Sequence, residues 1–160
     1  MGKTTALCHM AEISNLVLQL PTVEASEEYE HSVEIENATF SLFTHEIDVY
    51  ITPKAEHIDA SLSLLCDEAD AVILFIDHSQ KNALEELEVY IKRFIDHLDN
   101  IVIAVTHTDL DSQQLLKKYR NWLQMYDYAF PIFAIDARQK ADLELLLDVL
   151  IARTQIAEVD

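Results

Sequence analysis

Three stretches in the second half of the chain repeat apolar residues every three or four positions. This spacing is typical of helices that lay one face on a core and leave charged residues on the other face. We therefore predict helices there, with Leu115, Tyr119 and Trp122 on the core face of the middle one. The predicted helices span residues 82–98, 111–125 and 141–153.

Short, continuous apolar runs separate these helices. A strand that is buried on both faces of a parallel sheet has no polar face, so it appears in sequence as an uninterrupted apolar run. The runs comprise residues 71–76, 101–105 and 131–135. Strands that alternate with helices of this length predict βαβ units, and so an α/β fold with a parallel sheet flanked by helices.

The first half of the chain has a different pattern. Residues 4–20 and 57–67 have helical periodicity, and residues 22–30 are acidic without periodicity, which predicts an exposed loop. Residues 31–37 and 39–52 alternate apolar and polar side chains. We predict that they form two antiparallel strands joined by a short turn.

Composition limits the possible partners. With 160 residues, half of them apolar, the chain is long enough for one domain, residues 1–160. A formal charge of −18 repels phosphate backbones and anionic lipids, which argues against nucleic acid and membrane surfaces. We see neither a membrane-spanning run nor the pattern of a signal peptide, and we expect a cytoplasmic protein.

Cysteine, histidine and glycine usage adds three expectations. Cys8 and Cys66 lie in apolar helical patterns, and we expect reduced, buried thiols. The seven histidines lack ligand spacing, which disfavours a metal site built from side chains. Gly2 is the only glycine, and this scarcity argues against catalysis by mobile loops.

The first residues carry the end of a phosphate-binding motif. In a complete P-loop, G-x-x-x-x-G-K-[ST], backbone N–H groups hold the phosphates, the lysine reaches the β/γ-phosphates and the hydroxyl ligates Mg²⁺. The candidate residues here are Gly2, Lys3, Thr4 and Thr5. On its own the match is better explained as an ordinary helix start with a capping threonine.

Two segments follow the predicted strands, at the edge where open α/β sheets bind ligands. Asp109 could accept two hydrogen bonds from the N1–H and N2–H₂ groups of guanine, which adenine does not offer. The Arg138 plane could stack on the base. Taken singly, Asp109 and Asp136 are better explained as helix N-cap or turn residues. The candidate base-binding residues are Thr106, His107, Asp109, Asp136, Ala137 and Arg138.

Together these motifs resemble Ras-like small GTPases of the P-loop NTPase class. The similarity covers nearly the whole chain and lies with the prokaryotic group related to gliding-motility GTPases and predicted ATP/GTP-binding proteins. Residues 106–109 are similar to the family's [NT]-K-x-D base motif, with His107 at the lysine position. The resemblance implies GTP or GDP with Mg²⁺, held by Thr4 and, more loosely aligned, by Ser32.

The chain departs from that family at functional positions. Lys54 stands where the family has a glycine near the γ-phosphate, and Ala55 replaces the glutamine that orients water. Both changes predict slow hydrolysis. Glu56 or His57 could position water instead, although polar residues in the first turn of a helix explain them better. The first strand and the glycine-rich half of the P-loop are missing, so we expect a truncated record or a rearranged homo-oligomer.

Three functions are compatible with these residues. The first is a GTP-binding regulatory switch with weak or partner-dependent hydrolysis, which contacts regulatory proteins through loops 22–32 and 53–60. The second is a pseudo-GTPase, an interaction module on the same fold that no longer binds nucleotide. The third, a small P-loop kinase, is disfavoured because the chain lacks an Arg-rich lid and the kinase leaves Asp109 and Asp136 unexplained.

Overall fold

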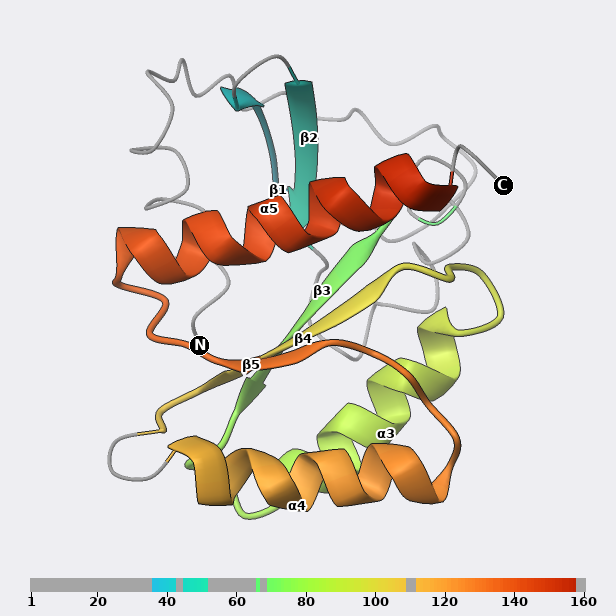
Figure 1. Ribbon diagram of the computed structural model, residues 1–160, viewed down its shortest axis with the longest axis vertical. Coiled ribbons are helices and arrows are strands. Elements are labelled where there is room, and N and C mark those ends of the chain that lie inside the picture. The colour runs from blue at the N-terminus through green and yellow to red at the C-terminus, as the bar shows by residue number, and fades with distance from the viewer. Residues whose placement is uncertain (1–35, 43–44, 52–65, 67–68, 109–111, 158–160) are drawn as a thin grey trace, which may run out of the picture.

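The computed structural model describes residues 36–42, 45–51, 66, 69–108 and 112–157, and it shows an α/β fold (Figure 1). The described strands form two sheets, an antiparallel pair and a three-stranded parallel sheet with helices on both faces. The elements in chain order are β1 (Glu36–Leu42), β2 (His45–Ile51), β3 (Val72–Asp77), α3 (Ala83–Phe94), β4 (Ile101–Thr106), α4 (Ser112–Met125), β5 (Ile132–Ala134) and α5 (Lys140–Ala157).

The parallel sheet has the order β3-β4-β5, which confirms the predicted βαβ units. All six residues of β4 are buried, as expected for a strand with neighbours on both sides and helices on both faces. The prediction of a strand buried on both faces is wrong for β3, where only Leu74 and Ile76 are buried. Ile73 and Phe75 lie on the α5 side, where they pack against the core but stay half-buried.

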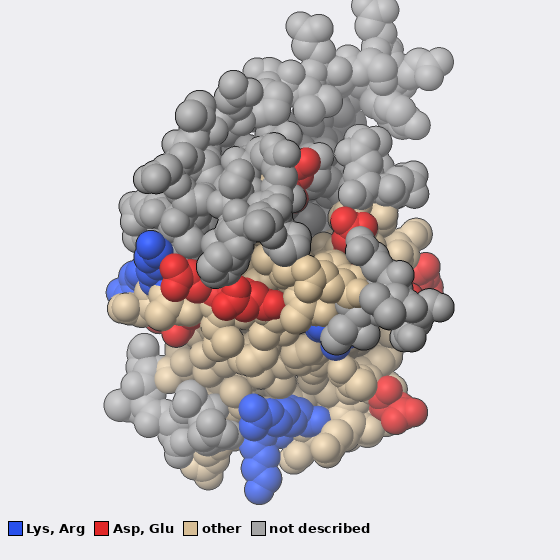
Figure 2. Space-filling view, turned by 45° about the horizontal axis from the view of Figure 1, so that its top comes forward, with Lys and Arg blue, Asp and Glu red and all other residues tan. Residues whose placement is uncertain are grey.

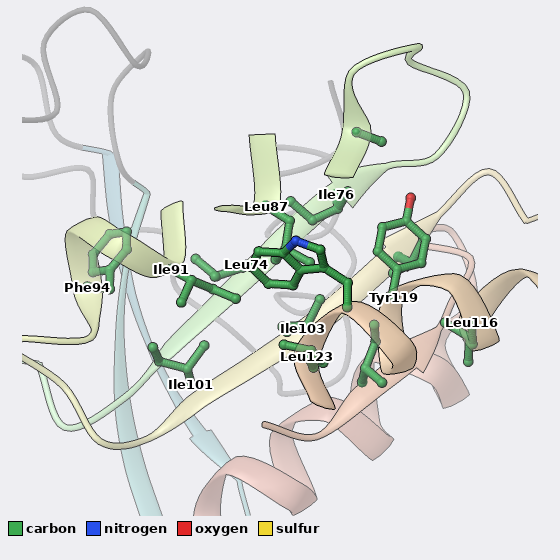
Figure 3. Close-up of a cluster of buried hydrophobic side chains, with 14 of the residues drawn as sticks. Leu74, Ile76, Leu87, Ile91, Phe94, Ile101, Ile103, Leu116, Tyr119 and Leu123 are labelled. Carbon is green, nitrogen blue, oxygen red and sulfur yellow. The ribbon is translucent and has the colours of Figure 1, made fainter. Parts of the chain in front are cut away.

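The larger core lies between the sheet and the helices α3 and α4 (Figure 3). Leu87 and Ile91 of α3 and Tyr119 of α4 are fully buried there. The predicted face of α4 is partly wrong: Leu115 is half-buried, while Leu116 is buried together with Tyr119, Trp122 and Leu123. Positions 116, 119 and 123 follow the helical repeat and set the face that meets the sheet.

Two of the predicted helices have different ends. The first, predicted over residues 82–98, ends as α3 at Phe94, because the chain turns through residues 95–97 before Leu98 packs into the core. The last extends to Ala157, four residues beyond its predicted end. There the Thr154 hydroxyl donates to the carbonyls of Leu150 and Ile151, so a polar residue stays within the helix.

A smaller core lies on the opposite face of the sheet, beneath α5. Leu143, Leu146 and Leu147 are buried there against Val102 and Ala104 of β4. This second core gives the sheet a helix layer on each face.

The antiparallel pair β1–β2 confirms the predicted hairpin, but its boundary was predicted wrongly. Thr39, expected to begin the second strand, lies inside β1 and pairs with Asp48. The apolar positions change from odd (Val33, Ile35) to even (Phe40, Leu42) near the predicted boundary, and β1 runs through this boundary without a turn. Ile47 and Val49 of β2 pack against the core beneath α5.

Several predictions lie outside the described residues: the helix over residues 4–20, the loops 22–32 and 53–60, and the helix over residues 57–67 apart from Cys66. Cys66 is half-buried against the larger core, where we expected a buried thiol. Among the described strands none lies between β2 and β3, which belong to separate sheets. From the family resemblance we expect one further strand between them. No helix in the described part of the chain is long and apolar enough to span a bilayer.

Candidate functional site

The three parallel strands end at a common edge, where we find the candidate site. The last residues of these strands are Asp77, Thr106 and Ala134. Because Asp77 pairs in register with Thr106, and Val105 with Ala134, the residues that follow each strand lie near one another. Polar side chains from all three junctions gather at this carboxyl edge.

Thr106 closes β4 against β3. Its side chain is buried, and its hydroxyl donates to the carbonyl of Ile76 at 3.3 Å. The backbone N–H of His78 in turn donates to the Thr106 carbonyl at 3.1 Å. Thr106 therefore holds the ends of two strands together, while its predicted contact with a base stays a prediction.

His107 turns the chain away from the sheet. Its φ of 57° lies in the left-handed region, which is uncommon for a residue with a side chain and stores strain of about 1 kcal/mol or more. Its Nδ1 lies 3.0 Å from Oδ1 of Asp77 and 3.2 Å from the Thr106 hydroxyl. A hydrogen on Nδ1 satisfies both oxygens, which leaves Nε2 to meet a ligand.

Asp77 is a site residue that our sequence analysis missed. Its carboxylate accepts hydrogen bonds from the backbone and side chain of Ser79, at 3.0 and 2.6 Å, and from Gln80. Burial raises the pKa of Asp77, but these hydrogen bonds and the charge of His107 outweigh it and leave the pKa below its ordinary value. The sequence did contain a signal for this residue. Asp77 directly follows the apolar run 71–76, just as Thr106 and His107 follow the apolar run 101–105.

Asp136 and Arg138 form a closed pair after β5. The guanidinium donates to both carboxylate oxygens at 2.8 to 3.3 Å, and the Arg138 backbone N–H donates to Oδ1 at 3.0 Å. Hydrogen bonding by Arg138 lowers the pKa of Asp136 to about 2. In this structure Arg138 is held against Asp136, and the assignment of both residues to a base site stays a prediction.

Ala137 and Asp142 complete the junction after β5. Ala137 is buried, so it offers little side-chain surface to a ligand. The backbone N–H of Asp136, which could meet a base carbonyl, instead donates to Oδ2 of Asp142 at 2.8 Å. Asp142 is in the first turn of α5, where a carboxylate favours the helix N-terminus.

A hydrogen bond connects the junction after β3 with α4. His78 Nδ1 lies 2.9 Å from the hydroxyl of Tyr119, and the two rings meet edge to face. Burial raises the pKa of the Tyr119 hydroxyl, with the Asp77 charge adding to the effect. The sequence marked Tyr119 as core but gave no sign of this contact, because its partner is 41 positions away.

The described part of the edge carries more carboxylates than unpaired cations. Asp77, Asp136 and Asp142 lie there with Arg138 and His107. Of the two lysines at this edge, Lys140 pairs with Glu144 and Lys81 is exposed. Such a surface suits a group that donates N–H bonds, whereas a triphosphate would need further positive charge. Among the described residues no group of three His, Cys, Asp or Glu is placed to hold a metal ion.

The remaining site candidates lie outside the described residues, so the structure does not place them relative to this edge. They are Gly2, Lys3, Thr4 and Thr5 for phosphate, Thr4 and Ser32 for Mg²⁺, and Asp109 for the base.

The fold defines an α/β protein whose polar junctions lie at the carboxyl edge of a parallel sheet. The sequence matches no model of a known protein family, and no curated protein is detectably similar to it. Arguments about function therefore rest on the residues and on this edge.

Proposed function

We propose that the protein is a GTP-binding regulatory switch of the small-GTPase type, with weak or partner-dependent hydrolysis. The observation that carries the proposal is the meeting of two candidate base-binding segments at one edge. His107 follows β4, and Asp136 follows β5, its in-register neighbour.

A guanine base suits this edge better than an adenine base does. Asp109, two residues after His107, would accept the N1–H and N2–H₂ hydrogens of guanine, while adenine would leave the carboxylate unpaired. The Nε2 of His107 is available as a further polar contact. Lys3 and Thr4 would hold phosphate and Mg²⁺, which supplies the positive charge that the described edge lacks.

Hydrolysis would be slow on this proposal. Lys54 stands where the resembled family has a glycine close to the γ-phosphate. Ala55 stands where that family has the glutamine that orients the attacking water. The protein would hold its nucleotide until a partner supplies the missing groups. Phosphate release approaching the roughly 5–20 s⁻¹ of an activated GTPase would overturn this part.

The test is competition for a fluorescent guanine nucleotide by GTP, ATP and xanthosine triphosphate, read by fluorescence anisotropy. We expect GTP to compete at least about tenfold better than ATP, and the variant Asp109→Asn to favour xanthosine triphosphate. Lys3→Ala should abolish binding of the guanine nucleotide, and Lys81→Ala, which removes an exposed lysine outside the candidate set, serves as its matched control. Equal competition by ATP and GTP would reduce Asp109 to a turn residue.

A second candidate is a pseudo-GTPase, an interaction module without nucleotide. The observation in its favour is that the described edge residues satisfy one another: Asp77 pairs with His107, and Asp136 pairs with Arg138. A base would have to compete with these contacts. If the purified protein shows no saturable binding of any guanine nucleotide with Mg²⁺ at millimolar concentration, this candidate replaces the switch.

A further inference from the structure

The opposite, amino edge of the parallel sheet carries a cluster of aromatic rings that the proposed function does not use. Trp122 lies 4.8 Å from Tyr126 and 6.1 Å from Tyr128, measured between ring centroids, and Tyr128 stacks on Phe130 at 5.5 Å. Tyr126 is 47 % exposed, and its neighbour Met125 is 76 % exposed. Large apolar side chains that gather on a surface in this way mark a site of interaction.

An open cavity of about 380 Å³ lies beside this aromatic cluster, between the end of α4 and the start of β5. Its apolar wall includes Tyr128, Phe130 and Phe133, and its polar wall is formed by Arg120 and Gln124. The volume is that of a small ligand site, large enough for one aromatic or branched side chain.

The helix beside the cavity is basic, although the exposed Asp127 follows it. The helix α4 contains three basic residues, Lys117, Lys118 and Arg120, and no acidic residue, in a chain with a net charge of −18. All three are exposed, and no ion pair within the described residues engages them. Figure 2 shows basic side chains projecting from the lower part of the molecule and a band of acidic side chains across its middle.

The backbone of β5 adds a place for an extended chain. The Pro131 carbonyl and the Ile135 N–H bond to β4, so in this parallel register the polar backbone groups of Ile132 and Ala134 face the outer edge. Among the described strands β5 has no neighbour on that side. An extended peptide can add to such an edge through main-chain hydrogen bonds.

We propose that this amino edge binds an extended acidic segment of a partner protein, with one large apolar side chain of the segment in the cavity. Carboxylates of the segment would pair with Arg120 and Lys117, which are three residues apart and so lie on one side of α4. A peptide fits better than nucleic acid, because a long polyanion would meet the strongly negative remainder of the molecule.

The experiment selects a phage-displayed library of random twelve-residue peptides on the immobilised full chain. We expect enriched peptides to carry more Asp and Glu than the library average, together with one aromatic or branched apolar residue. For a synthetic copy of the most enriched peptide, anisotropy should show Arg120→Glu weakening binding at least about tenfold. Lys81→Glu makes the same change to the charge of another exposed basic residue, at the opposite edge of the sheet, and should leave binding unchanged.

Three outcomes would overturn the proposal. These are no enrichment of acidic residues, equal binding by the Arg120→Glu protein, and displacement of the peptide by single-stranded DNA at equal charge concentration. Displacement by DNA would assign the basic residues of α4 to nucleic-acid binding. Because Arg120 is exposed, its variant should keep the wild-type thermal midpoint, and Gln124→Glu, on the same wall, gives a second variant with the same expected loss.

Discussion

The two edges of the parallel sheet are built from different kinds of contact. At the carboxyl edge, charged and polar side chains bind one another: Asp77 with His107, and Asp136 with Arg138. At the amino edge, aromatic rings pack together and leave basic side chains unpaired among the described residues. The comparison shows that one edge is held by directional contacts that a ligand would have to rearrange, while the other offers surface that a ligand could simply cover.

The largest effect should come from truncating the aromatic cluster. Trp122 is 9 % exposed and packs on two tyrosines, so Trp122→Ala should lower the free energy of unfolding by about 3–5 kcal/mol, as measured by urea denaturation. Met125→Ala, three residues away and largely exposed, should change it by less than about 0.5 kcal/mol. Similar losses in the two variants would contradict the assignment of Trp122 to the core.

A smaller effect is expected at the carboxyl edge. Thr106→Val keeps the shape of the side chain but removes the hydroxyl that donates to the Ile76 carbonyl, which should cost about 1 kcal/mol in urea denaturation. Thr106→Ser retains the hydroxyl and should recover most of that loss. NMR resonances of the His107 ring should move in the valine variant and stay near their original positions in the serine variant.

The smallest effect concerns the protonation of Asp136. Its folded pKa is lowered to about 2 from an ordinary 3.8, so its pairing with Arg138 stabilises the fold above about pH 4 and is lost as pH falls towards 2. Because the pair is partly exposed, we expect little change in global stability. A carboxyl NMR titration should give a midpoint near 2 in the wild type and one nearer 3.8 in Arg138→Gln. An unchanged midpoint would mean that Arg138 does not hold this carboxylate in solution.

The sequence predicted the layers of the fold better than the details of the edges. Apolar runs and helical spacing were enough for the βαβ order, because the period of the apolar positions distinguishes strands from helices. They did not distinguish the burial of β3 from that of β4, since that burial depends on the place of each strand in the sheet and on the elements that cover it. The pattern also did not place the turn between β1 and β2, because the change in apolar phase that suggested a turn lies between residues 35 and 38, where β1 begins.

The candidate site was predictable as a place but not as a set of contacts. The rule that ligands bind beyond the carboxyl ends of strands pointed to His107 and Asp136. It did not show that Asp136 and Arg138 would pair across two positions, because that contact depends on the turn geometry of the loop. The bond between His78 and Tyr119 was equally invisible, since it joins residues far apart in the chain.

Asp127 illustrates what the scarcity of glycine means for this chain. It ends α4 with a φ of 58°, and the N–H groups of Asp127 and Tyr128 return to the carbonyls of Gln124 and Leu123, a helix ending that usually places glycine at this position. A side chain in this conformation strains the native state by about 1 kcal/mol. The same side chain narrows the conformations open to the unfolded chain, which is worth about 0.4–1 kcal/mol in the opposite direction. The side chain at Asp127 is therefore close to neutral for stability, because the lower conformational entropy of the unfolded chain offsets the backbone strain in the folded protein.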